Sequence, residues 1–235
     1  MVEQPAAPGE GTRAFTPALG RPGLTGAYDL AIRVLTRERT WRSALLSQLA
    51  PANGEAILDV GCGTGTFALL VKRAAPGARV VGLDPDPAVL EIAAAKARRA
   101  GVEIEWRRGF AEDATGSGAE FDKTVSSLVF HQVPLEGKRR GIEAMARAVR
   151  PGGEVHIADY ARQRSWAMRQ LFRIVQRLDG EENTGANASG AIEQILARLD
   201  ARAGAATGSV RTATGEISLF RLQVTPEVSN RLILQ

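Results

Sequence analysis

A glycine-rich turn between an apolar run and a helical pattern places the tightest constraint on how this chain folds. The run Ile57-Leu58-Asp59-Val60 predicts a buried strand, residues 67–72 predict a helix, and Gly61, Gly63 and Gly65 lie between them. Glycine adopts positive φ without strain and lets a ligand approach the backbone closely. The start of the helix adds free N–H groups and the positive end of a helix dipole. The sequence therefore predicts a strand–turn–helix unit that binds a ligand.

Composition fits one soluble α/β domain. The chain has 235 residues, of which 44% are hydrophobic and 24% are charged, enough to bury a sizeable core. A single cysteine excludes an internal disulfide and favours a reducing compartment, so we expect a cytoplasmic protein. The net charge of +4 and the pI of 9.7 allow anionic partners without requiring them. No stretch has the length of a membrane span, and we expect no bound metal ion.

The pattern predicts one domain with a tail at each end. Residues 1–22 are rich in proline and lack the apolar run of a signal peptide, so we expect a disordered tail. Residues 23–225 would form the domain, and residues 162–200 would be a helical insertion that caps the active site. Residues 226–235 would form a C-terminal tail.

Strand-like and helical runs alternate over most of the chain. An amphipathic segment from Tyr28 to Leu49 comes first. The strand-like runs that follow are residues 57–60, 79–84, 102–107, 121–129 and 154–158. This alternation predicts a parallel sheet. Residues 162–200 give two helical patterns around a polar loop, Asp179–Gly190, and residues 209–214 and 217–224 then predict a hairpin with one antiparallel strand.

Two acids near the glycine turn narrow the choice of ligand. The dinucleotide fingerprint G-x-G-x-x-G needs its third glycine one position after Gly65, where this chain has Thr66. Asp59 would repel a pyrophosphate and suits a cationic ligand. Asp84 ends the second strand at the distance from the turn where an acid accepts hydrogen bonds from ribose. The pair predicts a positively charged ligand that carries ribose and no diphosphate.

Four segments, in this order along the chain, resemble the motifs of class I S-adenosylmethionine-dependent methyltransferases. They are residues 58–66, 82–84, 121–133 and 150–160. Within that family the chain is similar to the small-molecule group that includes the ubiquinone and menaquinone biosynthesis methyltransferases. The resemblance covers residues 25–224 and implies a Rossmann-like α/β fold. Its seven-stranded, mostly parallel sheet would have the order 3-2-1-4-5-7-6, with the last strand antiparallel and helices on both faces.

The resemblance also implies which residues bind S-adenosyl-L-methionine, whose product is S-adenosyl-L-homocysteine. Backbone groups of the turn would line the methionine part, and Asp59 would hold the turn and help the ammonium group. Asp84 would bind the ribose diol, with Pro85 beside the adenine. The expected cofactor-binding residues are Tyr28, Asp59, Gly61, Cys62, Gly63, Gly65, Asp84, Pro85, Phe110, Ala111, Glu112, Ser127 and Leu128.

One of these positions departs from the family's pattern. The family often has an acid after the third strand where this chain has Phe110. Its ring would instead cover the adenine, and the backbone at Ala111 would make the polar contact. Ser127 would lie beside the methionine group, and Tyr28 matches an aromatic residue that closes over the cofactor in relatives.

His131 and Tyr160 are the expected catalytic residues. The sulfonium of the cofactor is already a strong electrophile, so the protein mainly has to hold the acceptor in line with the methyl group. A hydroxyl or ring-carbon acceptor also needs a base. His131 follows the fourth strand next to the predicted methyl position, and Tyr160, after the fifth strand, is the next candidate. The alternatives are that His131 caps a helix and that both side chains form pocket walls.

Several functions are compatible with these motifs. We expect a methyltransferase that acts on a small hydrophobic or aromatic molecule, as a monomer or homodimer. A methyltransferase acting on RNA, DNA or protein is the alternative, but the chain lacks the Asn/Asp-Pro-Pro motif and an added RNA-binding module, so nucleic acid is not the expected partner. The glycine spacing speaks against a nicotinamide-dependent oxidoreductase. A relative that binds the cofactor without catalysis is the weakest alternative.

The helical pattern after Tyr160 carries one apolar and one cationic stripe. The expected apolar face, packed against the fold, consists of Trp166, Leu171, Ile174, Val175 and Leu178. The cationic stripe consists of Arg169, Arg173 and Arg177. A solvated face is the simplest interpretation of this stripe. Contact with an anionic substrate or a membrane surface is the other one.

Overall fold

The computed structural model describes residues 36–115 and 118–234. Tyr28 and the predicted N-terminal tail lie outside the described residues. The elements up to the middle of the chain are α2 (Glu38–Leu49), β1 (Ala56–Val60), α3 (Thr66–Ala74), β2 (Arg79–Asp84), α4 (Pro87–Ala100), β3 (Glu105–Arg108), η1 (Ala111–Thr115) and β4 (Phe121–Ser127). The later elements are η2 (Phe130–Gln132), α5 (Leu135–Ala148), β5 (Val149–Tyr160), α6 (Trp166–Asp179), α7 (Glu181–Ala188), α8 (Ala191–Leu199), β6 (Gly208–Thr212), β7 (Gly215–Gln223) and α9 (Pro226–Ile233).

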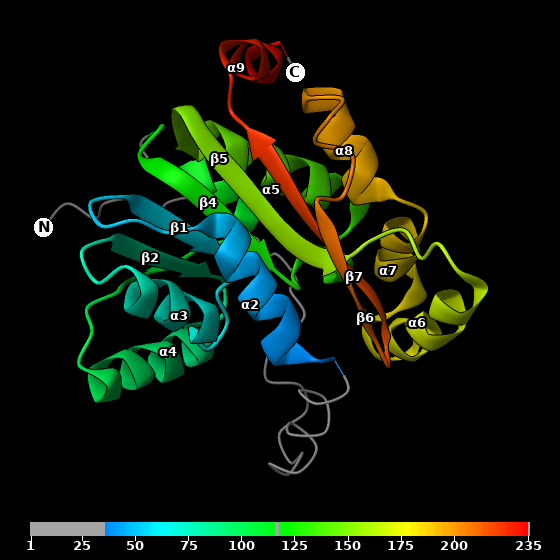
Figure 1. The fold of residues 1–235 in the computed structure, drawn as a ribbon, viewed down its shortest axis with the longest axis horizontal. Helices are drawn as coiled ribbons and strands as arrows, with labels where there is room; N and C mark the ends of the chain where they lie inside the picture. The colour runs from blue at the N-terminus through cyan, green and yellow to red at the C-terminus, as the bar shows by residue number, and fades with distance from the viewer. Residues whose placement is uncertain (1–35, 116–117, 235) are drawn as a thin grey trace, which may run out of the picture.

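The strands form one seven-stranded sheet with the order β3-β2-β1-β4-β5-β7-β6 (Figure 1). The pairs β1–β2, β1–β4, β2–β3 and β4–β5 are parallel, and β7 is antiparallel to both β5 and β6. The hairpin predicted near the C-terminus is the pair β6–β7. The predicted fold class is therefore confirmed, including its strand order.

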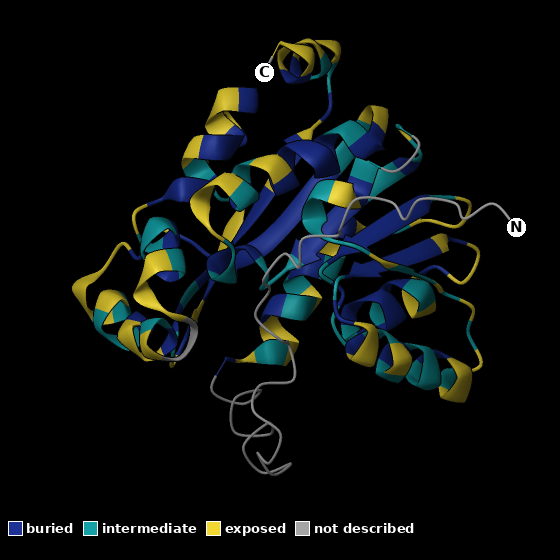
Figure 2. Ribbon diagram, turned by 180° about the vertical axis from the view of Figure 1, so that it is seen from behind, coloured by how far each residue is buried: buried dark blue, intermediate teal, exposed yellow. Residues whose placement is uncertain are grey.

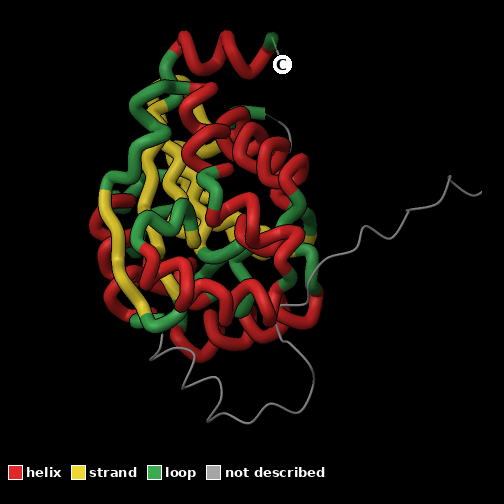
Figure 3. Tube along the Cα trace, turned by 90° about the vertical axis from the view of Figure 1, so that its right-hand side faces the viewer, coloured by secondary structure: helices red, strands yellow, loops and turns green. Residues whose placement is uncertain are grey.

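Helices cover both faces of the sheet (Figure 3). One cluster of buried apolar residues joins the sheet to α2, α3 and α6, and a second cluster joins it to α5, α8 and α9. All five residues of β1 are buried, which matches the nearly continuous apolar runs of strands covered on both faces. Figure 2 shows this arrangement as dark blue strands behind helices whose outer faces are yellow. Among the described helices, none combines the length and the apolar character that crossing a bilayer requires.

The predicted loop Asp179–Gly190 is wrong, because α7 occupies it. Two buried side chains, one of them within the helix, bond α7 to the rest of the fold. The amide of Asn187 donates to the Tyr160 carbonyl oxygen at 2.6 Å, and the Lys138 ammonium donates to the Asn183 carbonyl oxygen at 2.9 Å. Tertiary contacts thus override the weak helix propensity of a stretch rich in glycine and asparagine.

The predicted inward-facing apolar stripe of α6 is correct only in part. Val175 is buried and Leu171 is half-buried. Trp166 and Ile174, however, are exposed by 70% and 47%. The helix turns a narrower face toward β7 than the apolar residues alone suggest, and the Leu178 side chain lies outside the described part of the chain.

Trp106 joins the edge strand to the glycine turn. It is paired in register with Gly82 of β2, and its indole fills the space above that glycine. A Cβ atom on Gly82 would lie 2.5 Å from Trp106 Cζ3, and one on Gly65 would lie 2.6 Å from Trp106 Cη2. Both glycines therefore leave room for the indole ring, which packs against the glycine turn.

This packing predicts that Gly82→Ala destabilises the fold. The added methyl group must displace Trp106, so we expect the free energy of unfolding to fall by about 1–3 kcal/mol. Urea denaturation measures the change. Gly208→Ala is the matched control in a strand, because its new Cβ would meet no atom within 4 Å. An equal loss in both variants would contradict the role of Trp106.

Candidate active site

The glycine turn lies at the carboxyl end of β1 and is held to β2 by backbone hydrogen bonds. Gly61, Gly63 and Gly65 have φ angles of +69°, +51° and +73°, so all three adopt the left-handed region predicted for them. The N–H groups of Gly61 and Cys62 donate to the Leu83 carbonyl oxygen at 2.8 and 3.1 Å. The turn is therefore a fixed extension of the β1–β2 pair.

The turn is tightly packed at both ends and open in the middle. A Cβ atom on Gly61 would lie 2.3 Å from Val129 Cγ2, and Gly65 is closed off by Trp106. A Cβ atom on Gly63 would meet no atom within 4 Å. The backbone at Gly63 is the place where a ligand can approach most closely.

Asp84 ends β2 beside this open position. One carboxylate oxygen accepts from the Gly63 N–H at 2.8 Å, and the other accepts from the Asp86 N–H at 3.0 Å. Burial raises the pKa of Asp84, and these two hydrogen bonds partly offset that increase. Each oxygen has a second lone pair, so Asp84 can still accept hydrogen bonds from a ligand.

Asp59 is buried within β1, with 1% of its surface exposed. Neither carboxylate oxygen accepts a hydrogen bond of normal geometry. Burial raises the pKa of Asp59 to about 7, although the Arg42 guanidinium and the Ala68 N–H lower it in part. A buried carboxyl group without a firm partner costs stability and is typical of a site that binds something else.

The ends of β4 and β5 meet at a second polar cluster. Leu128 follows β4 with a φ of +56°, which is uncommon for a residue with a side chain and turns the backbone into η2. The carboxylate of Asp159, in β5, lies at the start of this short helix. Its Oδ2 accepts from the N–H groups of Val129, Phe130 and His131 at 3.0, 2.7 and 3.3 Å.

The same carboxylate holds the His131 ring. His131 Nδ1 lies 2.7 Å from Asp159 Oδ1, which also accepts from the Tyr160 N–H at 2.7 Å. Because a carboxylate accepts hydrogen bonds and donates none, the contact with Asp159 assigns the imidazole proton of a neutral ring to Nδ1 and makes Nε2 its acceptor. His131 is 4% exposed, so this arrangement is fixed inside the protein.

The structure brings both predicted catalytic side chains together. The ring centres of His131 and Tyr160 lie 5.2 Å apart in an edge-on arrangement. The Tyr160 hydroxyl lies 2.6 Å from Thr214 Oγ1. Sequence reasoning missed Asp159, although one signal was present: like Asp59 and Asp84, it is an acid near the end of an apolar strand.

The remaining predicted residues differ in their surroundings. Burial raises the pKa of the Cys62 thiol, so it is not a thiolate at neutral pH. Phe110 follows β3, where its N–H donates to Asp113 Oδ2 at 2.8 Å. Glu112 forms a 3.2 Å ion pair with Arg140. Ala111 begins η1, Pro85 directly follows β2, and Ser127 ends β4, so these residues lie near the same edge of the sheet.

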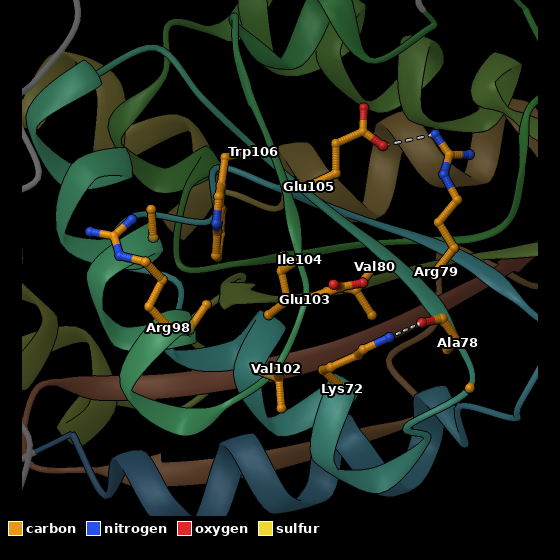
Figure 4. Close-up of a pocket in the computed structure, with 13 residues that line it drawn as sticks. Lys72, Ala78, Arg79, Val80, Arg98, Val102, Glu103, Ile104, Glu105 and Trp106 are labelled. Atoms are coloured by element: carbon orange, nitrogen blue, oxygen red, sulfur yellow. Dashed lines mark hydrogen bonds and ion pairs between the residues drawn. The ribbon is translucent and has the colours of Figure 1, made fainter.

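The hollow in Figure 4 lies elsewhere. Its volume is about 660 Å³, and Lys72, Arg79, Ile104 and Trp106 are among the residues that line it. Arg79 begins β2, so the hollow lies at the amino end of a strand whose carboxyl end carries Asp84. Ligands of such sheets bind at the carboxyl ends, so we place the active site at the glycine turn and not in this hollow.

The buried Asp59 predicts an unusual dependence of stability on pH. The pKa of Asp59 is 3.8 in the unfolded chain and about 7 in the folded protein, so between these values the folded protein holds a proton that the unfolded chain has released, and the wild type loses stability as pH rises. We expect the free energy of unfolding of Asp59→Asn, measured relative to the wild type, to increase on the order of 3 kcal/mol between pH values of about 4.5 and 8. Urea unfolding without ligand at both pH values tests this. A constant difference between the two proteins would show that Asp59 ionises normally.

Comparison with known proteins identifies the family. A family model described as a methyltransferase domain matches residues 57–153. Demethylmenaquinone methyltransferase from Deinococcus radiodurans is 30% identical over 149 residues, which are 63% of this chain and 61% of that protein. The Thermus thermophilus enzyme of the same name is 30% identical over 149 residues and is covered to 67%. Ubiquinone biosynthesis O-methyltransferase from Methylobacterium sp. is 35% identical over 119 residues, which are 50% of this chain and 46% of that protein. The chain thus spans about half to two thirds of the length of these relatives.

Solved structures support the same fold. Magnesium protoporphyrin IX methyltransferase from Synechocystis PCC 6803, with bound S-adenosylhomocysteine, aligns with a TM-score of 0.62 at 20% identity and covers 86% of this chain and 89% of its own. The PH0226 protein from Pyrococcus horikoshii aligns with a TM-score of 0.58 at 16% identity, covering 83% and 91%. The curated relatives, together with the matched domain, show that the chain belongs to the class I S-adenosylmethionine-dependent methyltransferases.

Proposed function

We propose that this protein transfers a methyl group to a small hydrophobic or aromatic molecule, and that the acceptor carries a phenol or hydroquinone ring. The observation that carries the proposal is the buried His131–Asp159 pair at the carboxyl ends of β4 and β5. The 3₁₀ turn that carries His131 packs against α7, and His131 is almost fully buried. The printed names of the relatives, demethylmenaquinone methyltransferase and ubiquinone biosynthesis O-methyltransferase, favour a quinone-type ring.

The residues at the glycine turn fit S-adenosyl-L-methionine. The Asp59 carboxyl group lacks a firm partner and lies behind the turn, so it suits the cationic methionine part of the cofactor. Asp84 has spare lone pairs for two ribose hydroxyls. The open backbone at Gly63 leaves room for close approach. We propose that Pro85, Phe110 and Ala111 flank the adenine.

Further residues complete the proposed cofactor site. Gly61 and Gly65 shape the turn by packing against Val129 and Trp106, and Cys62 contributes its backbone. Ser127 and Leu128, at the end of β4, lie on the methionine side. Glu112 is paired with Arg140 and would act through its backbone. Tyr28 lies outside the described residues, and its role as a lid stays a prediction.

His131 is the proposed general base. When bound, S-adenosyl-L-methionine supplies an electrophilic methyl group with a neutral thioether as leaving group. His131 Nε2 would take the proton from the acceptor hydroxyl as the new bond forms. Asp159 would hold the ring in the required tautomer and stabilise the imidazolium. Tyr160, whose hydroxyl contacts Thr214, would form the wall beside His131 and is the second candidate base.

The acceptor class can be tested directly. Purified protein is incubated with S-adenosylmethionine labelled with tritium on its methyl group. The acceptors are short-chain demethylated isoprenoid hydroquinones, simple catechols, bulk RNA and a protein extract. We expect transfer to one or more of the aromatic molecules and none to RNA or protein. Label recovered only in RNA or protein would overturn the small-molecule proposal.

Replacing Asp84 should weaken cofactor binding. Asp84→Ala removes the ribose acceptors and the support of the Gly63 N–H, so we expect a loss of about 1–3 kcal/mol in affinity for S-adenosylmethionine. Titration calorimetry measures the change. Asp122→Ala is the control, because that carboxylate also accepts a backbone N–H, from Ala56 at 2.7 Å, but lies near the amino end of β4. Unchanged affinity in Asp84→Ala would place the ribose elsewhere.

Replacing His131 should slow methyl transfer and leave cofactor binding intact. A lost general base lowers turnover by about 10²–10⁴-fold, so we expect His131→Ala to fall in that range with an unchanged Kd for S-adenosylmethionine. The other histidine provides the control. His156 is buried between Gln48 and Glu154, and His156→Gln should keep normal turnover. Equal turnover in His131→Ala and the wild type would remove His131 from the mechanism.

A further inference from the structure

The outer face of α6 combines exposed arginines with large exposed apolar side chains. Its cationic ridge is formed by Arg169, Arg173 and Arg177, which are all exposed. Trp166 and Ile174 lie on the same side, exposed by 70% and 47%. Phe172 and Val175 on the opposite side are buried in the core. The helix is therefore amphipathic, yet it carries two large apolar side chains among its cations.

The cations of this segment far outnumber its acids. Residues 161–178 contain five arginines and no acid, and the sequence of α6 has a single acid, Asp179, at its last position. Arg169 donates to the carbonyl oxygens of Gln163 and Arg164 at 3.2 and 3.3 Å, and not to a carboxylate. By contrast, Arg79, Arg107 and Arg139 each pair with two carboxylates. On the neighbouring helix α7, Glu181 borders a hollow of about 360 Å³ together with Arg169 and Arg173.

The chemistry of the face selects one kind of partner. Arginines attract the phosphates of an anionic lipid surface, and tryptophan is favoured at the level of the headgroups. The aliphatic Ile174 gains by entering the boundary of the acyl chains, whereas it gains little against a nucleic acid backbone. We propose that the outer face of α6 docks on the surface of an anionic bilayer, with Trp166 inserted between headgroups.

This docking would bring the bilayer close to the proposed acceptor site. α6 packs on β7 and on α7, and α7 in turn contacts the turn that carries His131. A hydrophobic acceptor dissolved in the bilayer could then reach the site from that side. Only this last step rests on the proposed function, because vesicle binding is measured without methyl transfer.

Binding is tested with the full chain and vesicles. One set contains phosphatidylcholine alone, and the other contains phosphatidylcholine mixed with phosphatidylglycerol. We expect sedimentation with the anionic vesicles only, and release at high salt. Trp41 is buried and Trp106 is half-buried, so a blue shift of tryptophan emission on binding would report mainly on Trp166. Equal binding to both vesicle sets, or to neither, overturns the proposal.

Substitutions locate the contact. Arg169→Gln/Arg173→Gln/Arg177→Gln should weaken vesicle binding about tenfold or more. Trp166→Ser should remove the blue shift. The control Arg73→Gln/Arg99→Gln/Arg202→Gln removes the same charge from exposed arginines elsewhere and should bind almost as well as the wild type. An equal loss in both triple variants contradicts the assignment to α6. A single-stranded oligonucleotide that binds through the same arginines while vesicles do not would replace the bilayer with a nucleic acid.

Discussion

Helices cover both faces of the sheet, and the burial that results limits the positions at which its strands can carry carboxylates. A strand buried on two sides tolerates few charges, and Asp59, Asp84 and Asp159 all lie near the carboxyl ends of their strands, where the chain leaves the sheet. Asp84 and Asp159 are satisfied there by backbone N–H groups of the adjoining turns. Each turn is therefore held by the acid beside it. The Asp84 carboxylate thus supports the glycine turn, and the Asp159 carboxylate supports the His131 turn.

Asp59 is the exception, and the contrast is informative. It lies one strand away from Asp84, yet neither of its oxygens has a hydrogen bond of normal geometry. Burial raises its pKa to about 7, so the folded protein loses stability when the group ionises. A neutral residue of the same size would avoid this cost. An acid at this position is understandable if a cationic ligand supplies the missing charge, because the free energy lost on folding is then recovered on binding.

The sequence alone predicts those features of the fold that depend on local patterns. The three glycines, the buried strands and the hairpin β6–β7 were all predicted, because period, turn residues and apolar runs act over a few neighbouring positions. The features that depend on distant contacts were not. α7 forms from a stretch rich in glycine and asparagine because Lys138 and Asn187 bond its ends to other elements. The hydrogen bond between Asp159 and His131 joins residues that are 28 positions apart, and no rule of sequence spacing predicts it. The exposure of Trp166 depends on how α6 is rotated about its own axis where it packs on β7.

Lys138 joins α7 to the His131 turn. Its ammonium donates to the carbonyl oxygens of Val133, just after the His131 turn, and of Asn183 in α7. Burial lowers the pKa of Lys138 to about 8, and the Asp159 carboxylate partly opposes this. Asn187 bonds the same helix to Tyr160 at the end of β5. α7 is therefore tied to both strand ends that carry His131 and Asp159. These buried hydrogen bonds couple the position of α7 to that of the His131 turn.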